Sequence, residues 1–285
     1  MKLRIATRPS KLAVIQAELL ADQLLKIGIE AEIIKVVTEG DEGKFDISRK
    51  SAFTLRLEEF LLKEKADVAV HSLKDLPSER PEGLQISFPI ADDPADCLVA
   101  NDNYASLFDV KSGATIGTSS LRRKALLKLY RPDLNVLDLK GNVDTRLKKL
   151  REGLYDAEIL SCAALKRLKE KYNTVRLSPE FFVPAPGQGI IAVEFLSKRR
   201  EIEEILTNIA DKDVVLRARI EMEFNKLMEG GCHFPAGIYT IITENKLRIK
   251  GYYSDGIKHV FAEVQSEKES YEEAVKELVR LLKGR

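Results

Sequence analysis

The chain has 285 residues, 44% hydrophobic and 32% charged, with a formal net charge of +1. This composition is typical of a folded protein with more than one core, and it excludes a disordered or fibrous chain. The balanced charge argues against a general nucleic-acid-binding surface, and the apolar runs are shorter than the roughly 20 residues of a membrane-spanning helix. Charges within the first five residues leave no visible signal peptide, so we expect a cytoplasmic protein.

The first part of the chain alternates strand and helix signals. Strands are expected at residues 2–6, 31–38 and 67–71, and helices at 10–27 and 51–65. Ser10 is suited to cap the first helix, and Gly28 to end it. This order predicts a mainly parallel sheet with helices on both faces.

A second unit repeats the pattern. We expect strands at residues 97–100, 114–117, 135–139 and 157–160, and helices at 119–130 and 143–151. The segment Pro184–Gly189 combines rigid and flexible residues, which indicates a hinge or a crossing between units.

The pattern changes from about Asp211. A helix through Met228 is followed by Gly230 and Gly231, which would end it. Strands at 236–242, 246–253 and 258–265 and a final helix at 270–282 predict a small α+β unit with an antiparallel sheet.

The three cysteines are spread widely along the chain. Their odd number argues against a disulfide framework, and Cys97 and Cys162 fit the pattern of small buried hydrophobes. Cys232 follows two glycines outside any apolar periodicity, so a reactive thiol on a loop is as well supported as a buried one. No close pair of cysteine and histidine ligands is present, and we expect no metal site.

Polar residues follow several predicted strands, where ligands bind in doubly wound sheets. These residues are Arg8, Ser10, Ser72, Lys74, Asp75, Thr118, Ser119, Ser120, Arg122, Arg123, Lys140 and Arg146. Two arginines in the first turn of a helix oppose its dipole, so helix propensity does not explain them. They favour a site for carboxylates or phosphates, and a solvated basic turn is the alternative. Asp75 is either a turn aspartate or a carboxylate that stabilises a cation in a basic site.

Six ordered segments resemble the porphobilinogen deaminase (hydroxymethylbilane synthase) family over nearly the whole chain. They are Arg4–Ser10, Ala69–Pro77, Gly117–Arg123 (GTSSLRR), Lys140–Arg146, Pro186–Gly189 (PGQG) and Glu229–Cys232. The resemblance implies two lobes like those of periplasmic solute-binding proteins, formed by residues 1–92 with 190–208 and by 96–184. It also implies a third domain over residues 211–285.

The resemblance implies an enzyme that joins four porphobilinogen molecules head to tail on a covalent dipyrromethane cofactor, releasing ammonia each time. Hydrolysis then frees 1-hydroxymethylbilane. Cys232 would anchor the cofactor through a thioether, and Asp75 would be the catalytic carboxylate. The acetate and propionate groups of each ring would be bound by Arg8, Ser10, Lys50, Ser72, Lys74, Thr118, Ser119, Ser120, Arg122, Arg123, Lys140, Arg146, Arg167 and Gln188. Like the family, the chain is expected to be a monomer without nucleic-acid or membrane partners.

Three positions depart from the family pattern. Lys140 stands where arginine is usual and lacks its bidentate fork. Glu39 replaces a common basic residue, and Ser51 replaces a usual glycine after Lys50, in a segment that resembles a mobile lid.

Three other interpretations remain open from the residues. A two-lobed solute-binding protein shares the expected fold but needs neither Asp75 nor Cys232. A homologue that folds without catalysing is a second alternative. An acyl or phosphoryl transferase using Thr118–Ser120 is a third, although no phosphate-binding loop or paired histidine supports it.

Overall fold

The structure, a computed structural model, describes residues 2–38, 54–77, 80–228 and 235–284. The chain forms two compact units, and each is considered by itself. Unit 1 comprises Met1–Asp92 and Ile190–Arg219, and unit 2 comprises Asp93–Gly189 and Ile220–Arg285. The predicted division into three domains stays a prediction.

Unit 1 is built on a five-stranded sheet of order β2-β1-β3-β10-β4. The strands are β1 (Lys2–Thr7), β2 (Glu30–Lys35), β3 (Val68–Ser72), β4 (Leu84–Ile90) and β10 (Ile191–Leu196). Strand β1 is parallel to β2 and β3, whereas β10 is antiparallel to β3 and β4. Four of the five strands therefore run the same way and only β10 is reversed, which confirms the mainly parallel sheet.

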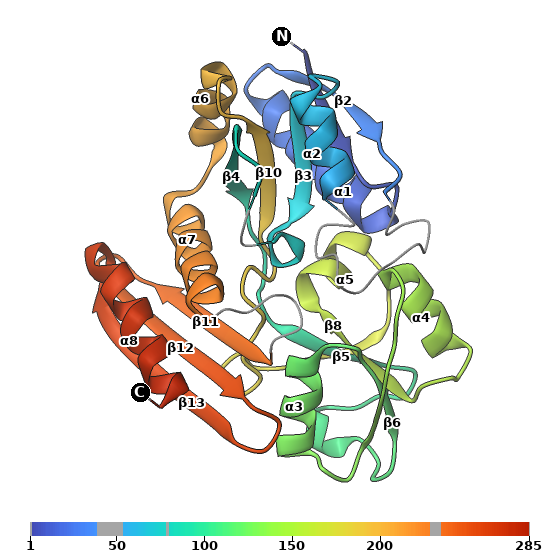
Figure 1. The fold of residues 1–285 in the computed structure, drawn as a ribbon. Helices are drawn as coiled ribbons and strands as arrows, with labels where there is room; N and C mark the ends of the chain where they lie inside the picture. Colours follow the sequence, from blue (N-terminus) through green and yellow to red (C-terminus); the bar gives the residue numbers. More distant parts are fainter. Residues whose placement is uncertain (1, 39–53, 78–79, 229–234, 285) are drawn as a thin grey trace. The chain divides into compact units, whose positions relative to one another are not determined.

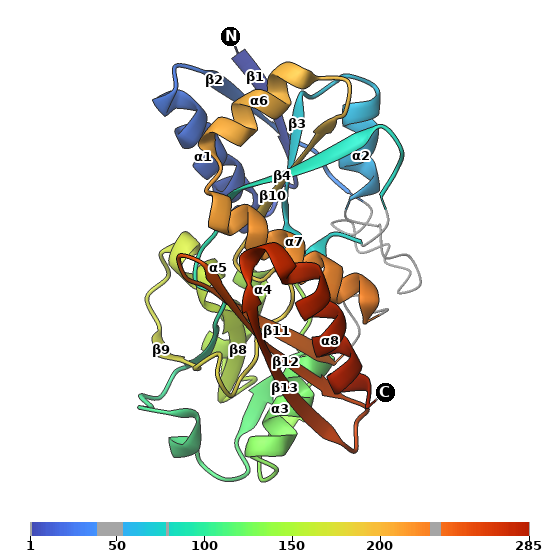
Figure 2. The same ribbon diagram turned by 90° about the vertical axis from the view of Figure 1, so that its left-hand side faces the viewer.

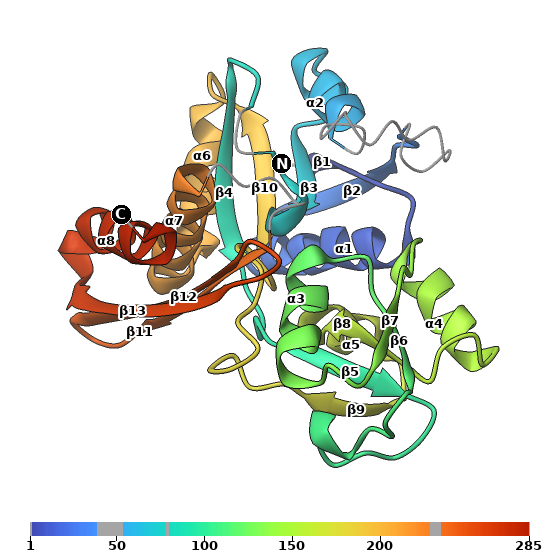
Figure 3. The same cartoon turned by 60° about the horizontal axis from the view of Figure 1, so that its bottom comes forward.

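Helices cover both faces of this sheet (Figure 3). Helices α1 (Lys11–Lys26) and α6 (Arg200–Ile209) pack Leu20, Leu24 and Leu206 on one face, against alternate residues of β1, β3 and β10. Helix α2 (Leu55–Leu62) packs Leu57 and Leu61 on the other face, against Ala6 and Ala69. The period of two along each strand separates these two cores.

Local capping explains where α1 begins and ends. The Ser10 hydroxyl accepts a hydrogen bond from the Ala13 amide at 3.4 Å, as expected of an N-cap. Gly28, the second residue after the end of α1, has a φ of 79°, a conformation that glycine adopts without strain. Both predictions from the sequence are confirmed.

Unit 2 contains a second five-stranded sheet with the equivalent strand directions, of order β7-β6-β8-β5-β9. Its strands are β5 (Asp96–Ala100), β6 (Thr115–Gly117), β7 (Asn135–Leu137), β8 (Ala157–Ser161) and β9 (Asn173–Arg176). Here β5 is the reversed strand, antiparallel to both β8 and β9. Figure 1 shows α3 (Leu121–Tyr130), α4 (Val143–Arg151) and α5 (Cys162–Leu168) around it.

The faces of this second sheet also have separate cores. Leu126 and Leu127 of α3 pack with Leu98 and Ile159 on one face. Leu147 and Leu150 of α4 pack with alternate residues of β5 and β8 on the other.

A three-stranded antiparallel sheet follows, of order β11-β12-β13. It consists of β11 (Ala236–Ile242), β12 (Lys246–Ser254) and β13 (His259–Glu267), after α7 (Lys212–Leu227). Helix α8 (Tyr271–Lys283) lies along β12 and β13 (Figure 2). The predicted C-terminal antiparallel sheet is confirmed, and β11 has the bounds expected from the sequence.

The prediction about the cysteines is wrong in one respect. Cys97 and Cys162 form a disulfide, with their Cα atoms 5.2 Å apart. Cys97 lies on β5 opposite Leu160 of the neighbouring strand β8, and Cys162 directly follows β8. Their separation of 65 positions in the sequence conceals this proximity, because only strand pairing brings the two cysteines together.

We expect the disulfide to contribute about 4 kcal/mol to the free energy of unfolding, since it closes a loop of 65 residues. The double substitution Cys97→Ala/Cys162→Ala should lower that free energy by this amount in urea denaturation. The wild-type chain treated with a reductant is the control and should match the variant. Equal stability of the oxidised and reduced chains would contradict the prediction.

Candidate functional site

In unit 1, the segments after β1 and β3 meet at one edge of the sheet. The two strands pair in parallel, with Ile5 opposite Val68 and Ala6 opposite Ala69, so their carboxyl ends lie side by side. The structure therefore brings together the segments that carry the predicted residues of unit 1: Arg8, Ser10, Ser72, Lys74 and Asp75.

Asp75 lies on a short, well-anchored turn. It ends the 3₁₀ helix η1 (Leu73–Asp75), and its side chain is exposed. The amide of Leu73 donates to the carbonyl of Ile190 at 3.0 Å. The hydroxyl of Ser72 accepts a hydrogen bond of 2.9 Å from the buried Gln16 of α1, a residue that sequence reasoning missed. The turn thus presents Asp75 to solvent from a fixed strand end.

In unit 2, the predicted GTSSLRR segment connects β6 to α3. Thr118 is buried, and its hydroxyl accepts a hydrogen bond from the Ser120 amide at 3.3 Å. Ser120 is the N-cap of α3 and accepts a hydrogen bond from the Arg123 amide at 3.4 Å. Two hydroxyls are therefore used to set the angle at which the helix leaves the sheet.

The two arginines of this segment are buried, which excludes the solvated basic turn. Arg122 is 3% exposed and Arg123 is 6% exposed. Both contact Asp96, a fully buried carboxylate, through Nη2 atoms at 2.7 Å and 2.6 Å. The Nη1 atom of Arg122 donates to the carbonyl of Val183 at 2.6 Å, and that of Arg123 to the carbonyl of Ile159 at 2.7 Å.

Gln188 completes this cluster. Its side-chain amide donates to the carbonyl of Pro94 at 2.7 Å and to Asp96 at 2.9 Å. Burial alone would raise the pKa of Asp96, but Arg122, Arg123 and Gln188 outweigh it and lower the pKa to about 2. Sequence reasoning missed Asp96; an acidic residue at the start of an otherwise apolar strand was the available signal.

The remaining basic residues of unit 2 differ in exposure. Lys140 is exposed, and Arg146 is half-buried, with its Nε donating to the carbonyl of Gly141 at 2.7 Å. Arg167 is buried and donates to the carbonyl of Gly189 at 2.6 Å. Only Lys140 and Arg146 among these three therefore combine charge with accessible surface.

Glu158 is a second buried carboxylate that the sequence analysis did not single out. It lies on β8 opposite Gly117 and Val99, and it is completely buried. Neither carboxylate oxygen has a hydrogen-bond partner among the described residues. Burial raises the pKa of Glu158 to about 7, although Arg146 and Arg123 act in the opposite direction.

Several predicted positions lie outside the described residues. These are Lys50 and Cys232, with Glu39 and Ser51 among the departures from the family pattern. Within the described part, no helix has the length and apolar character to cross a membrane. No cluster of metal-ligating side chains occurs in that part either.

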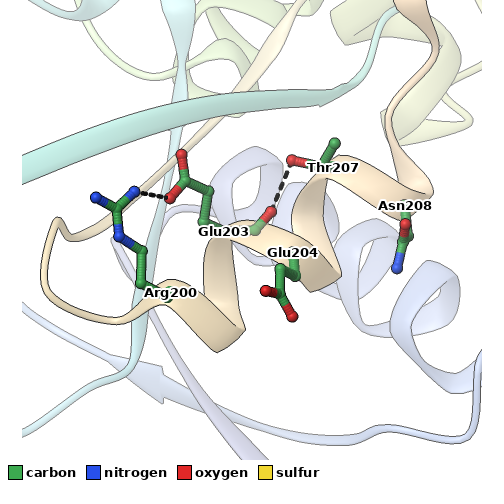
Figure 4. A pocket seen from close by; sticks show the side chains of 5 residues that line it. All are labelled: Arg200, Glu203, Glu204, Thr207 and Asn208. Carbon is green, nitrogen blue, oxygen red and sulfur yellow. Dashed lines mark hydrogen bonds and ion pairs between the residues drawn. The ribbon is translucent and has the colours of Figure 1, made fainter.

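One pocket lies on the surface of α6 (Figure 4), lined by Arg200, Glu203, Glu204, Thr207 and Asn208. Arg200 pairs with Glu203 at 2.7 Å one helical turn away. The lining contains none of the predicted site residues, so we do not assign the reaction to this pocket.

Comparison with known proteins is decisive for the family. Residues 3–204 match the model described as "Porphobilinogen deaminase, dipyromethane cofactor binding domain", and residues 215–283 match "Porphobilinogen deaminase, C-terminal domain". The chain belongs to the porphobilinogen deaminase family. Its activity is therefore that of a transferase, hydroxymethylbilane synthase, which acts on porphobilinogen with a dipyrromethane cofactor.

The sequence similarity between this chain and its relatives extends over most of the length of each protein. The chain is 43% identical to a probable porphobilinogen deaminase of Sulfurisphaera tokodaii, covering 84% of this chain and 82% of that protein. It is 42% identical to a porphobilinogen deaminase of Xylella fastidiosa, with 87% and 84% covered. A probable porphobilinogen deaminase of Hyperthermus butylicus is 40% identical, with 94% and 91% covered.

Among solved structures, the fold is similar to the periplasmic VFT2 domain of Bordetella pertussis BvgS. The TM-score is 0.45 at 16% identity, with 76% of this chain and 91% of that chain covered.

We expect Asp96→Asn to destabilise the chain by about 3–5 kcal/mol, because it leaves Arg122 and Arg123 buried without a counter-charge. The lowered pKa also sets a pH dependence. The contribution of Asp96 is present above its unfolded pKa of about 3.8 and is lost as pH falls through about 2. Urea denaturation at neutral and acidic pH measures both effects.

Asp133→Asn is the matched control for Asp96, since Asp133 pairs with Arg131 at 2.6 Å but is exposed at the surface. It should cost much less stability, because water screens exposed pairs. Equal losses in the two variants would contradict the dominant role of Asp96.

Glu158 should make the chain less stable as pH rises. Its folded pKa is about 7, above the ordinary value of 4.5, so its stabilising contribution is complete below about 4.5 and is lost as pH rises through about 7. Glu158→Gln should remove this dependence. The free energy of unfolding of the variant minus that of the wild type should therefore rise by about 2–3 kcal/mol between pH ~5 and pH ~8.

Denaturation at these two pH values measures the effect. Glu152→Gln, which changes an exposed carboxylate of the same unit, should keep the wild-type dependence. A Glu158→Gln variant that lost stability as steeply as the wild type would show that another group titrates.

Proposed function

We propose that this chain catalyses the family reaction with Asp75 as its catalytic carboxylate and Cys232 as the anchor of the cofactor. The observation that carries the proposal is the position of Asp75. It is exposed at the end of η1, next to Lys74, at the edge where the segments after β1 and β3 meet. An aspartate serving only as a turn residue needs no such presentation from an anchored strand end.

The described residues fit a polycarboxylate cofactor. Each pyrrole ring of dipyrromethane carries carboxylate side chains, and guanidinium and ammonium groups are suited to bind them. Arg8, Lys74, Lys140 and Arg146 are exposed or half-buried at the strand ends of their own units. We propose these four as the main carboxylate-binding cations.

The buried arginines have a more indirect proposed role. Arg122 and Arg123 already bind Asp96 and backbone carbonyls, and Arg167 binds the carbonyl of Gly189. We propose that they shape the ends of β6 and β8, from which the half-buried Ser119 and Ser120 reach a bound carboxylate. A contact of the buried Thr118 with that carboxylate stays a prediction. A direct carboxylate-binding role for the three arginines stays a prediction, as it does for Gln188.

The disulfide supports the assignment of Cys232. The chain has three cysteines, and Cys97 is bonded to Cys162. Cys232 is then the remaining cysteine, with no second free cysteine in the chain to compete for a thioether link or to form a disulfide with it. When bound, the dipyrromethane supplies the pyrrole carbon to which the first substrate is joined.

Asp75 performs three tasks in this proposal. Its carboxylate accepts hydrogen bonds from pyrrole N–H groups and so orients the rings. It stabilises the cation left on the substrate ring when ammonia departs. It also accepts the proton released when the new carbon–carbon bond restores the aromatic pyrrole.

We further propose that the enzyme acts as a monomer in the cytoplasm, without nucleic-acid or membrane partners. The balanced net charge supports the absence of a nucleic-acid partner. A structural disulfide is rare in a reducing cytoplasm except in hyperthermophiles. The Cys97–Cys162 disulfide and a cytoplasmic location together therefore favour a hyperthermophilic host.

The test combines intact-protein mass with turnover. The wild-type chain should carry an added mass of about two pyrrole units, and Cys232→Ser should lack it. Asp75→Asn should retain the added mass and lose at least about a hundredfold in kcat, because the variant can neither hold the cation nor accept a proton. Hydroxymethylbilane formation from porphobilinogen measures kcat.

Asp92→Asn is the control for the loss of an acidic residue of unit 1 outside the proposed site. It should retain both the added mass and turnover. Near-normal turnover by Asp75→Asn would overturn the catalytic assignment, and added mass on Cys232→Ser would overturn the anchor.

A further inference from the structure

Unit 1 contains four ionisable side chains on or near the face of the sheet that α2 covers. His71 lies on β3 and Glu194 on β10, and both point to the face that α2 covers. The strand register shows this, because Ala192 pairs with His71 and Glu194 pairs with Ala69, one of the residues packed against α2. Glu58 comes from α2 itself, and Arg80 follows the segment that contains Asp75.

His71 and Glu194 are in contact, and Glu58 and Arg80 interact with this pair electrostatically. The Nε2 atom of His71 lies 3.3 Å from the Oε2 atom of Glu194, with side chains 5% and 0% exposed. Glu58 is buried, and it interacts with Glu194, His71 and Arg80. Arg80 in turn interacts with both glutamates. The four residues form one cluster that contains two carboxylates, one guanidinium and one imidazole.

The cluster is expensive to bury. Burial raises the pKa of Glu58, and Glu194 adds to that effect. Burial also lowers the pKa of Arg80, which the two glutamates oppose. One oxygen of Glu58 and both oxygens of Glu194 lack hydrogen-bond partners among the described residues. Buried charges of this kind stabilise a fold little, so a role in specifying one local structure is the better explanation.

The two nitrogen-bearing side chains of the cluster stand on either side of Asp75 in the chain. His71 precedes it by four positions, and Arg80 follows it by five. The contact of His71 with Glu194 and the electrostatic attraction of Arg80 to both carboxylates therefore favour holding both ends of this segment at the sheet. Ser72 faces the opposite layer and is bound by Gln16, so consecutive residues at the end of β3 are held from both sides.

We propose that His71, Glu194, Glu58 and Arg80 are positioning residues for the transferase reaction, which hold the Asp75 segment from its two ends. The inference rests on the catalytic role proposed for Asp75. None of the four needs to touch substrate. They act by fixing where the Asp75 carboxylate meets the reacting rings.

The decisive experiment uses cofactor-loaded enzyme and three variants of the cluster. Arg80→Met should lower kcat roughly tenfold or more, since a displacement of about 1 Å in a catalytic group has effects of this size. The KM for porphobilinogen should change less than kcat, because three of the four proposed carboxylate-binding cations (Arg8, Lys140 and Arg146) lie outside this segment. Arg80→Lys keeps the charge and should recover most of kcat.

The double variant Glu58→Gln/Arg80→Met separates positioning from stability. Removing one carboxylate together with its cation should return the melting temperature toward the wild-type value, while kcat stays low because the end of the segment is no longer held. Recovery of kcat together with melting temperature would overturn the proposal and leave a merely structural role.

Arg56→Met is the matched control, since Arg56 lies on α2 beside Glu58 but is exposed. It should leave kcat unchanged. Asp75→Asn distinguishes the two levels of the argument. If Asp75→Asn is inactive and Arg80→Met is normal, the positioning inference alone fails. If Asp75→Asn turns over normally, the catalytic assignment on which the inference rests also fails.

Discussion

The buried ion cluster at Asp96 joins separate segments of unit 2 around one charge. A carboxylate with no exposed surface is tolerated only with well-placed partners, and Asp96 has Arg122, Arg123 and Gln188. These partners come from the start of α3 and from the connector before β10. One charge therefore ties together a strand, a helix start and the Pro184–Gly189 segment. The packing of these three segments against one another depends on an ionised Asp96 carboxylate.

Unit 1 also contains buried carboxylates, but their partners are arranged differently. Glu58 and Glu194 are two buried carboxylates that interact with His71 and Arg80, and the His71–Glu194 distance of 3.3 Å is longer than the ion-pair distances of Asp96. The Asp96 cluster satisfies its charges with short hydrogen bonds, whereas oxygens of Glu58 and Glu194 remain without partners among the described residues.

The reversed strand in each sheet explains why each cluster lies near the strand ends of its own unit that carry proposed site residues. Strand β5 begins at Asp96, opposite Ser161 at the end of β8, and β10 begins at Ile191, opposite Ser72 at the end of β3. Each reversed strand thus starts at the edge where the parallel strands end. The chain segments leading into β5 and β10 contribute Pro94, Gln188 and Ile190 to the hydrogen bonds at those edges.

By itself, the sequence was sufficient for the order of the main elements, the α1 capping, the family and the strand-end residues, because propensity, periodicity and motifs are local signals. It did not reveal β4, β9, β10, α5 or α6. The Cys97–Cys162 disulfide, the burial of Arg122 and Arg123 against Asp96, and the His71–Glu194 contact were decided by tertiary structure. Each depends on strands that pair across long stretches of chain. Burial then determines whether a charge is solvated, paired or shifted in pKa, and that environment does not exist until the sheets have formed.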